Sequence, residues 1–291
     1  MLKAVEVGVL LLERAYAKIN LTLDVLCKRA DGYHEVDMVM QTVDLSDLIW
    51  LEETTERGIR VESNVSHLPR DSRNLAVAAA GLFMRYTGIE KGLHIRIDKQ
   101  IPVAAGLAGG SADAAAVLRG LNRMWKTGYS LEELASLGAS IGSDIPFCVH
   151  GGCAVARGRG ERIEQVVHGF KPWVVLVKPA VFVSTADIYQ ALTPADYKTT
   201  PVSSKMVQKL YKGDFEAVGK YISNGLKATT FRLYPEVEQL GQRVAHVTNT
   251  KVHMSGSGPT LFCLAKTQSS AQRMYNALRG FTKEVHLSRF V

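Results

Sequence analysis

The chain has 291 residues, 46% of them apolar and 22% charged, and its 35 Lys and Arg residues exceed its 28 Asp and Glu residues to give a formal net charge of +7. This length suffices for two domains or one large one, and the composition is that of an ordinary globular protein with a sizeable core. The basic residues are scattered without a run of five like charges, which argues against a nucleic-acid-binding tail, whereas a mild basic excess suits polyphosphate ligands.

The four cysteines show neither a Cys-x-x-Cys pair nor the spacing of a disulfide framework, so we expect a reducing compartment, the cytoplasm. Cys148, His150 and Cys153 lie close in sequence, but a metal cluster is not expected because a fourth nearby ligand is missing. The apolar run 7–12 is too short for a signal sequence or a membrane span.

The first quarter of the chain is predicted to be antiparallel sheet. Residues 15–25 alternate strictly between apolar and polar, which predicts a strand with one buried face and places Lys18 and Asn20 together on its polar face. A lysine there is ordinarily a solvated charge. The turn 28–34 contains an Asp-Gly pair that favours a hairpin. Further strands are expected at 36–45, 48–53 and 58–62.

A glycine-rich loop follows a predicted strand at 93–97 and opens an alanine-rich helix; its sequence over Pro102–Ala116 is PVAAGLAGGSADAAA. The first N–H groups of a helix have no partner within the helix and the helix dipole is positive there, so such a loop can bind an anion. Gly106, Gly109 and Gly110 can take positive φ, and Ser111 suits the N-cap or a bond to phosphate or metal. The loop matches neither a P-loop nor a dinucleotide fingerprint, and a tight turn with a helix cap is the alternative.

The remaining pattern predicts an α+β chain with mixed sheets packed with helices. One helix is expected at 74–86 and another from Ser130, where Glu133 completes a capping box, and Asp144 then lies in a constrained turn before Pro146. After strands at 153–156 and 162–167, a change in composition divides predicted domains 1–168 and 169–291. The second domain is predicted to contain strands at 174–178, 261–265 and 285–288 and helices at 185–192, 203–211, 215–226, 235–245 and 271–278.

Four separated segments, in this order and over nearly the whole chain, resemble the GHMP small-molecule kinases: AKIN at 17–20, the loop 102–116, GSDIP at 142–146 and SGSGP at 255–259. The resemblance implies a two-domain fold with the active site in the cleft between the domains. It also implies ATP as co-substrate and Mg²⁺ as the counter-ion of its phosphates. The turn RADGYHE at 29–35 is similar to that of family members whose alcohol substrate, a methylerythritol, carries a cytidine diphosphate group.

Carried over residue by residue, the resemblance implies that Lys18 and Asp144 are catalytic. A carboxylate near a hydroxyl can accept its proton as the oxygen attacks the γ-phosphorus, and a nearby ammonium can stabilise the developing negative charge. The residues implied to bind ATP are Pro102, Val103, Ala104, Ala105, Gly106, Leu107, Ala108, Gly109, Gly110, Ser111 and Ala112.

The same resemblance implies the substrate-binding residues. His34 is expected to grip the cytosine by hydrogen bonds and Tyr33 by stacking, Phe182 is a second stacking ring, and Asn20 touches the methylerythritol. The loop 255–258 is expected near the phosphates.

Two departures from the family pattern stand in the loop. Ala104, Ala105 and Ala108 stand where glycine is common, which predicts a stiffer loop. Gly110 stands where many members have the metal-binding serine, so a metal role for Ser111 is left open.

The sequence disfavours two alternative functions. Another family substrate, such as homoserine, has no obvious use for a base-gripping Tyr-His pair. A non-enzymatic RNA-binding protein would show clustered basic residues interleaved with exposed aromatics, which the scattered charges disfavour. We therefore expect small-molecule partners without nucleic acid or membrane, and either a monomer or a homodimer.

Overall fold

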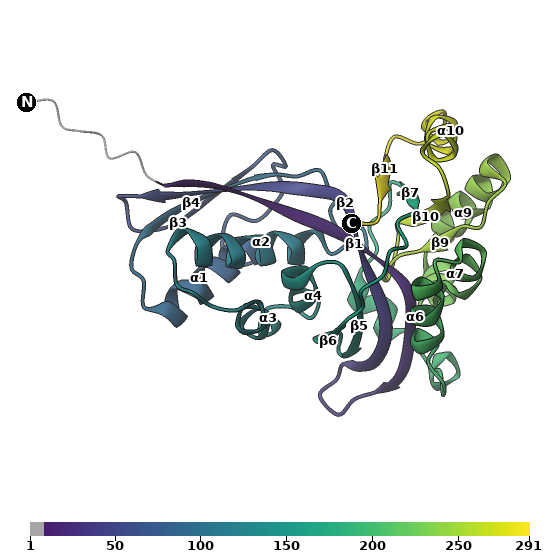
Figure 1. Ribbon diagram of the computed structural model, residues 1–291, viewed down its shortest axis with the longest axis horizontal. Coiled ribbons are helices and arrows are strands. Elements are labelled where there is room, and N and C mark those ends of the chain that lie inside the picture. Colours follow the sequence, from purple (N-terminus) through teal and green to yellow (C-terminus); the bar gives the residue numbers. More distant parts are fainter. Residues whose placement is uncertain (1–8) are drawn as a thin grey trace, which may run out of the picture. The chain divides into compact units, whose positions relative to one another are not determined.

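A computed structural model describes residues 9–291, which form two compact units (Figure 1). The first unit contains residues 9–15, Ser46–Gln100 and Gly110–His150, and the second contains Tyr16–Leu45, Ile101–Gly109 and Gly151–Val291. Because both units are discontinuous in sequence, they do not test the division at 168/169, which stays a prediction. Of the apolar run at 7–12, residues 7 and 8 lie outside the described residues.

The strands of the described chain are β1 (Leu10–Lys28), β2 (His34–Thr54), β3 (Gly58–Ser63), β4 (Gly92–Asp98), β5 (Cys153–Gly158), β6 (Arg162–Gln165), β7 (Trp173–Val177), β8 (Ser223–Asn224), β9 (His253–Met254), β10 (Leu261–Ala265) and β11 (Val285–Arg289). Its α-helices are α1 (Leu75–Thr87), α2 (Gly109–Met124), α3 (Leu131–Ala139), α4 (Ile145–His150), α5 (Thr185–Gln190), α6 (Ser203–Lys212), α7 (Phe215–Tyr221), α8 (Lys227–Leu233), α9 (Pro235–Thr248) and α10 (Gln268–Arg279). Within residues 9–291, no helix combines the length and the apolar character that crossing a membrane requires.

In the first unit, β4 lies between β3 and the second half of β2. It pairs antiparallel with β2 but parallel with β3, so the prediction of purely antiparallel sheet is wrong here. The predicted strands at 36–45 and 48–53 are one continuous strand, β2. Helices α1 and α2 pack on this sheet, since Gly81 faces the Ile59 side chain and Gly120 faces Leu51.

The caps of two helices in this unit follow local sequence signals. The Asn74 side chain accepts a hydrogen bond from the Ala76 amide at the start of α1. Ser130 and Glu133 form the predicted capping box of α3. The predicted helix at 74–86 is confirmed within one residue at each end, and the predicted start of α3 is confirmed within one residue.

In the second unit, β1 lies between β2 and β8, β5 pairs with β2, and β6 pairs with β5. A second sheet has the antiparallel order β11-β7-β10-β9 and is joined to β2 by a bridge between Val43 and Phe290. The helix predicted at 215–226 ends at Tyr221, because Ser223 and Asn224 pair with β1 as β8. Helix α8, which follows, was not predicted.

The face of β1 that carries Lys18 and Asn20 is buried, which corrects the prediction of a single buried face. Lys18 is 4% exposed, and Asn20, Thr22 and Asp24 are no more than 1% exposed. The buried polar groups have partners: Thr22 Oγ1 accepts from the Val39 amide, and Asp24 accepts from the Val202 amide. A strand that buries its polar face in this way provides ordered polar groups for a site.

Candidate active site

Lys18 and Asn20 form a buried donor group on β1. Lys18 Nζ donates to Asn20 Oδ1 at 2.8 Å, and Asn20 Nδ2 donates to Met38 Sδ at 3.2 Å. The backbone N–H of Asn20 donates to Ser255 Oγ at 3.3 Å. The lysine ammonium is therefore held in one position by neighbouring side chains, as an electrostatic catalyst requires.

The glycine-rich loop is curled by left-handed residues at alternate positions. Ala104, Gly106 and Ala108 have φ values of 50°, 71° and 57°. Alternation of left-handed and other conformations turns successive backbone amides toward one side, which creates a concave anion-binding nest. Alanine pays a steric cost for this conformation, and such strain is typical of functional sites. The Lys18 amide donates to Leu107 O at 3.1 Å and so ties the loop to β1.

The conformations correct two expectations for the end of the loop. Gly109 and Gly110 are already helical, so Gly106 is the predicted glycine that takes a positive φ. Because α2 begins at Gly109, Ser111 lies inside the first turn and is not the N-cap. Its half-buried hydroxyl stands at the positive end of the helix dipole.

The loop Ser255–Gly258 packs directly against the glycine-rich loop. Ser255 Oγ donates to Gly106 O at 2.9 Å, and a Cβ at Gly106 would lie 2.4 Å from Ser255 O. Only glycine permits this approach of the two backbones. Asn224 Nδ2 supports the packing by donating to Met254 O at 2.9 Å and Gly256 O at 2.8 Å.

Asp144 belongs to the first unit, at the start of α4. Its carbonyl accepts from the Cys148 amide at 3.0 Å. A Cβ at Gly142 would lie 4.0 Å from Ser111 Oγ, so the predicted Gly-Ser-Asp turn and the first turn of α2 are neighbours in this unit. Gly138 of α3 allows the close packing that positions α4, since a Cβ there would lie 2.4 Å from Ile145 Cγ2.

His34 is part of an aromatic cluster in the second unit. Its buried ring lies 5.2 Å from the ring of Tyr189 and 5.9 Å from that of Tyr197, whose hydroxyl is 3.4 Å from His34 Nε2. Burial, with a smaller effect of the Lys28 charge, lowers the pKa of His34 and favours the neutral ring. The sequence pattern did not reveal Tyr189 and Tyr197 as neighbours of His34. They lie more than 150 residues further along the chain, and only folding brings them to the turn between β1 and β2.

Tyr33 and Phe182 present accessible rings. Tyr33 is 53% exposed and packs on one side against the Arg159 guanidinium, 4.9 Å from its ring centroid. Phe182 is 68% exposed and precedes α5. The accessible Tyr33 ring next to His34 suits the stacking and hydrogen bonding of a flat heterocycle.

Glu35 anchors the hairpin that carries Tyr33 and His34. Its two carboxylate oxygens accept from Arg29 Nη1 and Arg162 Nη2, each at 2.6 Å, and from the Gly158 amide at 3.2 Å. The hairpin is thus tied to the turn between β5 and β6. Glu35 is the last residue of the turn motif at 29–35, but its role as an anchor was not predicted.

Among residues 9–291, no group of three or more His, Cys, Asp and Glu side chains is arranged to hold a metal ion. Among the residues predicted to bind ATP, Ser111 is the one with a side-chain oxygen, and a hydroxyl is a suitable ligand for the hard cation Mg²⁺.

A buried lysine tied to a loop with the backbone of an anion-binding nest suits a small-molecule kinase, and the comparisons with known proteins give that class. The protein-family model described as GHMP kinases N terminal domain matches residues 74–152. The family model described as GHMP kinases C terminal matches residues 206–283. The chain belongs to the GHMP kinases, which confirms the family resemblance and the α+β fold class.

Two curated relatives carry the same name, 4-diphosphocytidyl-2-C-methyl-D-erythritol kinase. The chain is 48% identical to that of Bacillus pumilus over 281 residues, 97% of each chain, and 48% identical to that of Exiguobacterium sibiricum over 280 residues, 96% of this chain and 97% of the relative.

Solved structures extend the comparison. A crystal structure of 4-(cytidine 5'-diphospho)-2C-methyl-D-erythritol kinase is similar with a TM-score of 0.82 and 31% identity, covering 96% of this chain and 99% of that one. Homoserine kinase from Cytophaga hutchinsonii has a TM-score of 0.75 at 17% identity, covering 100% of this chain and 96% of that one, and shares the fold.

Proposed function

We propose that this GHMP kinase uses ATP to phosphorylate the 2-hydroxyl of 4-diphosphocytidyl-2-C-methyl-D-erythritol, a step of the non-mevalonate isoprenoid precursor pathway. The observation that carries the proposal is 48% identity over 97% of both chains to a relative with this name. The neutral His34 and the accessible rings of Tyr33 and Phe182 support a cytidine-bearing substrate.

In the proposed mechanism, the Asp144 carboxylate accepts the proton of the 2-hydroxyl while that oxygen attacks the γ-phosphorus of ATP and ADP leaves. Lys18 stabilises the negative charge that develops. Its burial and its bond to Asn20 support this role, because a fixed, desolvated ammonium acts more strongly than a solvated one.

The proposed ATP site is the loop Pro102–Ala112, whose amides bind the phosphates. The left-handed conformations of Ala104, Gly106 and Ala108 support it, because they build a nest of amides. Mg²⁺, when bound with the nucleotide, would be held mainly by the phosphates and would neutralise their charge, with the Ser111 hydroxyl as the nearest protein oxygen proposed from the sequence. The proposed partners are otherwise small molecules alone, without nucleic acid or membrane, and the proposed compartment is the cytoplasm.

The test is ADP release with Mg-ATP and purified 4-diphosphocytidyl-2-C-methyl-D-erythritol, set beside homoserine and mevalonate under identical conditions. We expect turnover with the cytidyl compound alone. Turnover only with another alcohol would leave the family unchanged but refute the proposed roles of Tyr33 and His34.

A further inference from the structure

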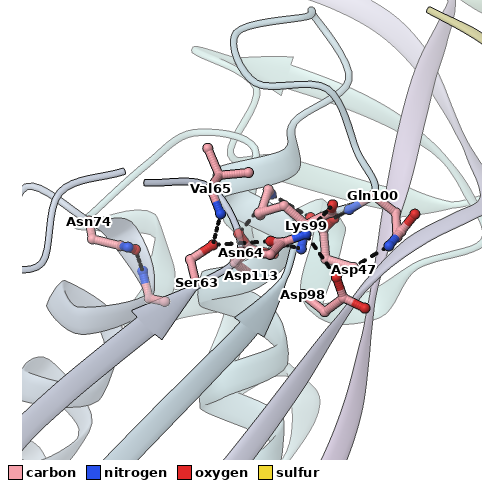
Figure 2. Close-up of polar contacts among 10 residues, drawn as sticks. Asp47, Ser63, Asn64, Val65, Asn74, Asp98, Lys99, Gln100 and Asp113 are labelled. Atoms are coloured by element: carbon pink, nitrogen blue, oxygen red, sulfur yellow. Dashed lines mark hydrogen bonds and ion pairs between the residues drawn. The ribbon is translucent and has the colours of Figure 1, made fainter. Parts of the chain in front are cut away.

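A buried cluster of three charged side chains lies in the first unit (Figure 2). Lys99 Nζ donates to Asp113 Oδ2 at 2.9 Å and also to Asp47 Oδ2. The side chains of Lys99, Asp47 and Asp113 are 4%, 0% and 5% exposed. Three buried ionisable groups are costly to desolvate, so their joint burial is weak evidence for a stabilising role.

The cluster stands where the chain enters and leaves the glycine-rich loop. Lys99 and Gln100 lie three and two residues before the start of the loop Pro102–Ala112, and Asp113 of α2 directly follows its end. The backbone N–H of Gln100 donates to Asp47 Oδ1 at 2.6 Å, so Asp47 of β2 holds the backbone just before the loop. Lys99 then links this point to the first turns of α2, which closes the loop at its base.

A second set of contacts holds the end of β4, which directly precedes Lys99. The Lys99 amide donates to Asn64 Oδ1 at 2.8 Å, and Asn64 Nδ2 donates to Asp98 Oδ1 at 2.9 Å (Figure 2). The backbone before the loop is therefore held in place from the segment that follows β3 as well as from β2. On α2, the Asp113 carboxylate accepts the hydrogen bond from Lys99 Nζ.

The charge state of the cluster is consistent with a tight link. Burial raises the pKa of Asp113 well above its usual value; the Lys99 charge opposes this effect and the Asp47 charge reinforces it. Burial by itself would lower the pKa of Lys99, but attraction to both aspartates outweighs it and raises that pKa. Lys99 is thus a cation that bridges the two carboxyl groups.

We propose that Lys99 is a positioning residue that, through Asp47 and Asp113, fixes both ends of the phosphate-binding loop and thereby sets its affinity for ATP. The proposal rests on the proposed function only in that the loop binds ATP. It is independent of the acceptor alcohol.

The test measures dissociation constants of the full chain for Mg-ATP and, separately, for 4-diphosphocytidyl-2-C-methyl-D-erythritol by calorimetric titration. Lys99→Met keeps the length of the side chain but removes the bridge between two carboxyl groups. We expect at least a tenfold weaker affinity for ATP and an affinity for the cytidyl compound within twofold of the unchanged chain. A merely structural role would weaken both ligands together.

A second variant separates positioning from direct contact with the nucleotide. In Lys99→Met combined with Asp113→Asn, the new amide can donate to Asp47 and reconnect α2 to β2. We expect its ATP affinity to return to within threefold of the unchanged chain. Lys91→Met is the control for loss of an ion-paired lysine: Lys91 is half exposed and is paired with Glu53 in the same unit at 2.8 Å, eleven residues before Pro102; it should bind ATP normally.

An ATP affinity within twofold of normal in Lys99→Met would overturn the proposal, and so would a double variant that binds as weakly as the single one. If Lys99→Met does not fold, the double variant alone decides. If neither folds, the cluster serves folding and the proposal is wrong. An unchanged chain that binds ATP but does not turn over the cytidyl compound would refute the proposed acceptor only, whereas failure to bind ATP would overturn both proposals.

Discussion

Replacing Gly106 by alanine tests how the glycine-rich loop is built. Gly106 has a φ of 71°, and a Cβ there would lie 2.4 Å from Ser255 O and 2.8 Å from Gly258 O. Both obstacles are backbone atoms of the neighbouring loop, which cannot rotate away as a flexible side chain would. The variant must therefore push the two loops apart.

The expected cost has two parts. A left-handed alanine costs roughly 1–2 kcal/mol, reduced by about 0.4–1 kcal/mol because alanine also restricts the unfolded chain. Forcing an extra methyl group into a packed site costs typically about 1–3 kcal/mol. We therefore expect Gly106→Ala to lower the free energy of unfolding by about 1–5 kcal/mol and to weaken ATP binding by tenfold or more.

Two matched variants isolate these parts in urea unfolding. Gly213 also has a positive φ, 63°, but no atom lies within 4 Å of the place that a new methyl group would occupy, so Gly213→Ala should cost only about 1 kcal/mol. Ala104→Gly relieves the left-handed conformation while loosening the unfolded chain, and should stay within about 1 kcal/mol of the unchanged protein. If Gly106→Ala costs no more than Gly213→Ala, the close approach of the two loops is wrong.

Three further predictions concern the reaction and acid stability. Asp144→Asn should lower kcat by about two to four orders of magnitude with little change in KM, and near-normal turnover would remove Asp144 from its proposed role. Glu35→Gln should raise KM for the cytidyl substrate about threefold to tenfold at unchanged kcat, because the hairpin loses its charged anchor; a fall in kcat alone would contradict this. Burial, aided by Lys227 and Lys251, lowers the pKa of His253 to about 4. The unfolded chain therefore binds more protons below pH 6.5, and up to roughly 3 kcal/mol of stability should be lost between pH 6.5 and 4 in urea titrations. His253→Leu should reduce that slope, and an unchanged slope would refute the assignment.

Local signals in the sequence predicted much of the fold. Asn74, Ser130 and Glu133 identified two helix starts because a cap depends on residues within one turn. The strict alternation at 15–25 identified β1, and the glycines at 106–110 located the loop before α2. The family motifs named the proposed site residues, since short motifs keep their spacing whatever surrounds them.

Tertiary structure decided what depends on partners distant in sequence. The polar face of β1 is buried because other segments cover it, and β8 replaces the end of a predicted helix because its residues pair with Thr22 and Leu23. The aromatic neighbours of His34 and the bridge from Lys99 to both aspartates likewise join residues that no periodicity links. The sequence by itself determined the starts of α1 and α3 and the position of the glycine-rich loop, because those depend on neighbouring residues. Which polar groups are buried, and what holds them there, was decided by contacts formed only when the chain folds.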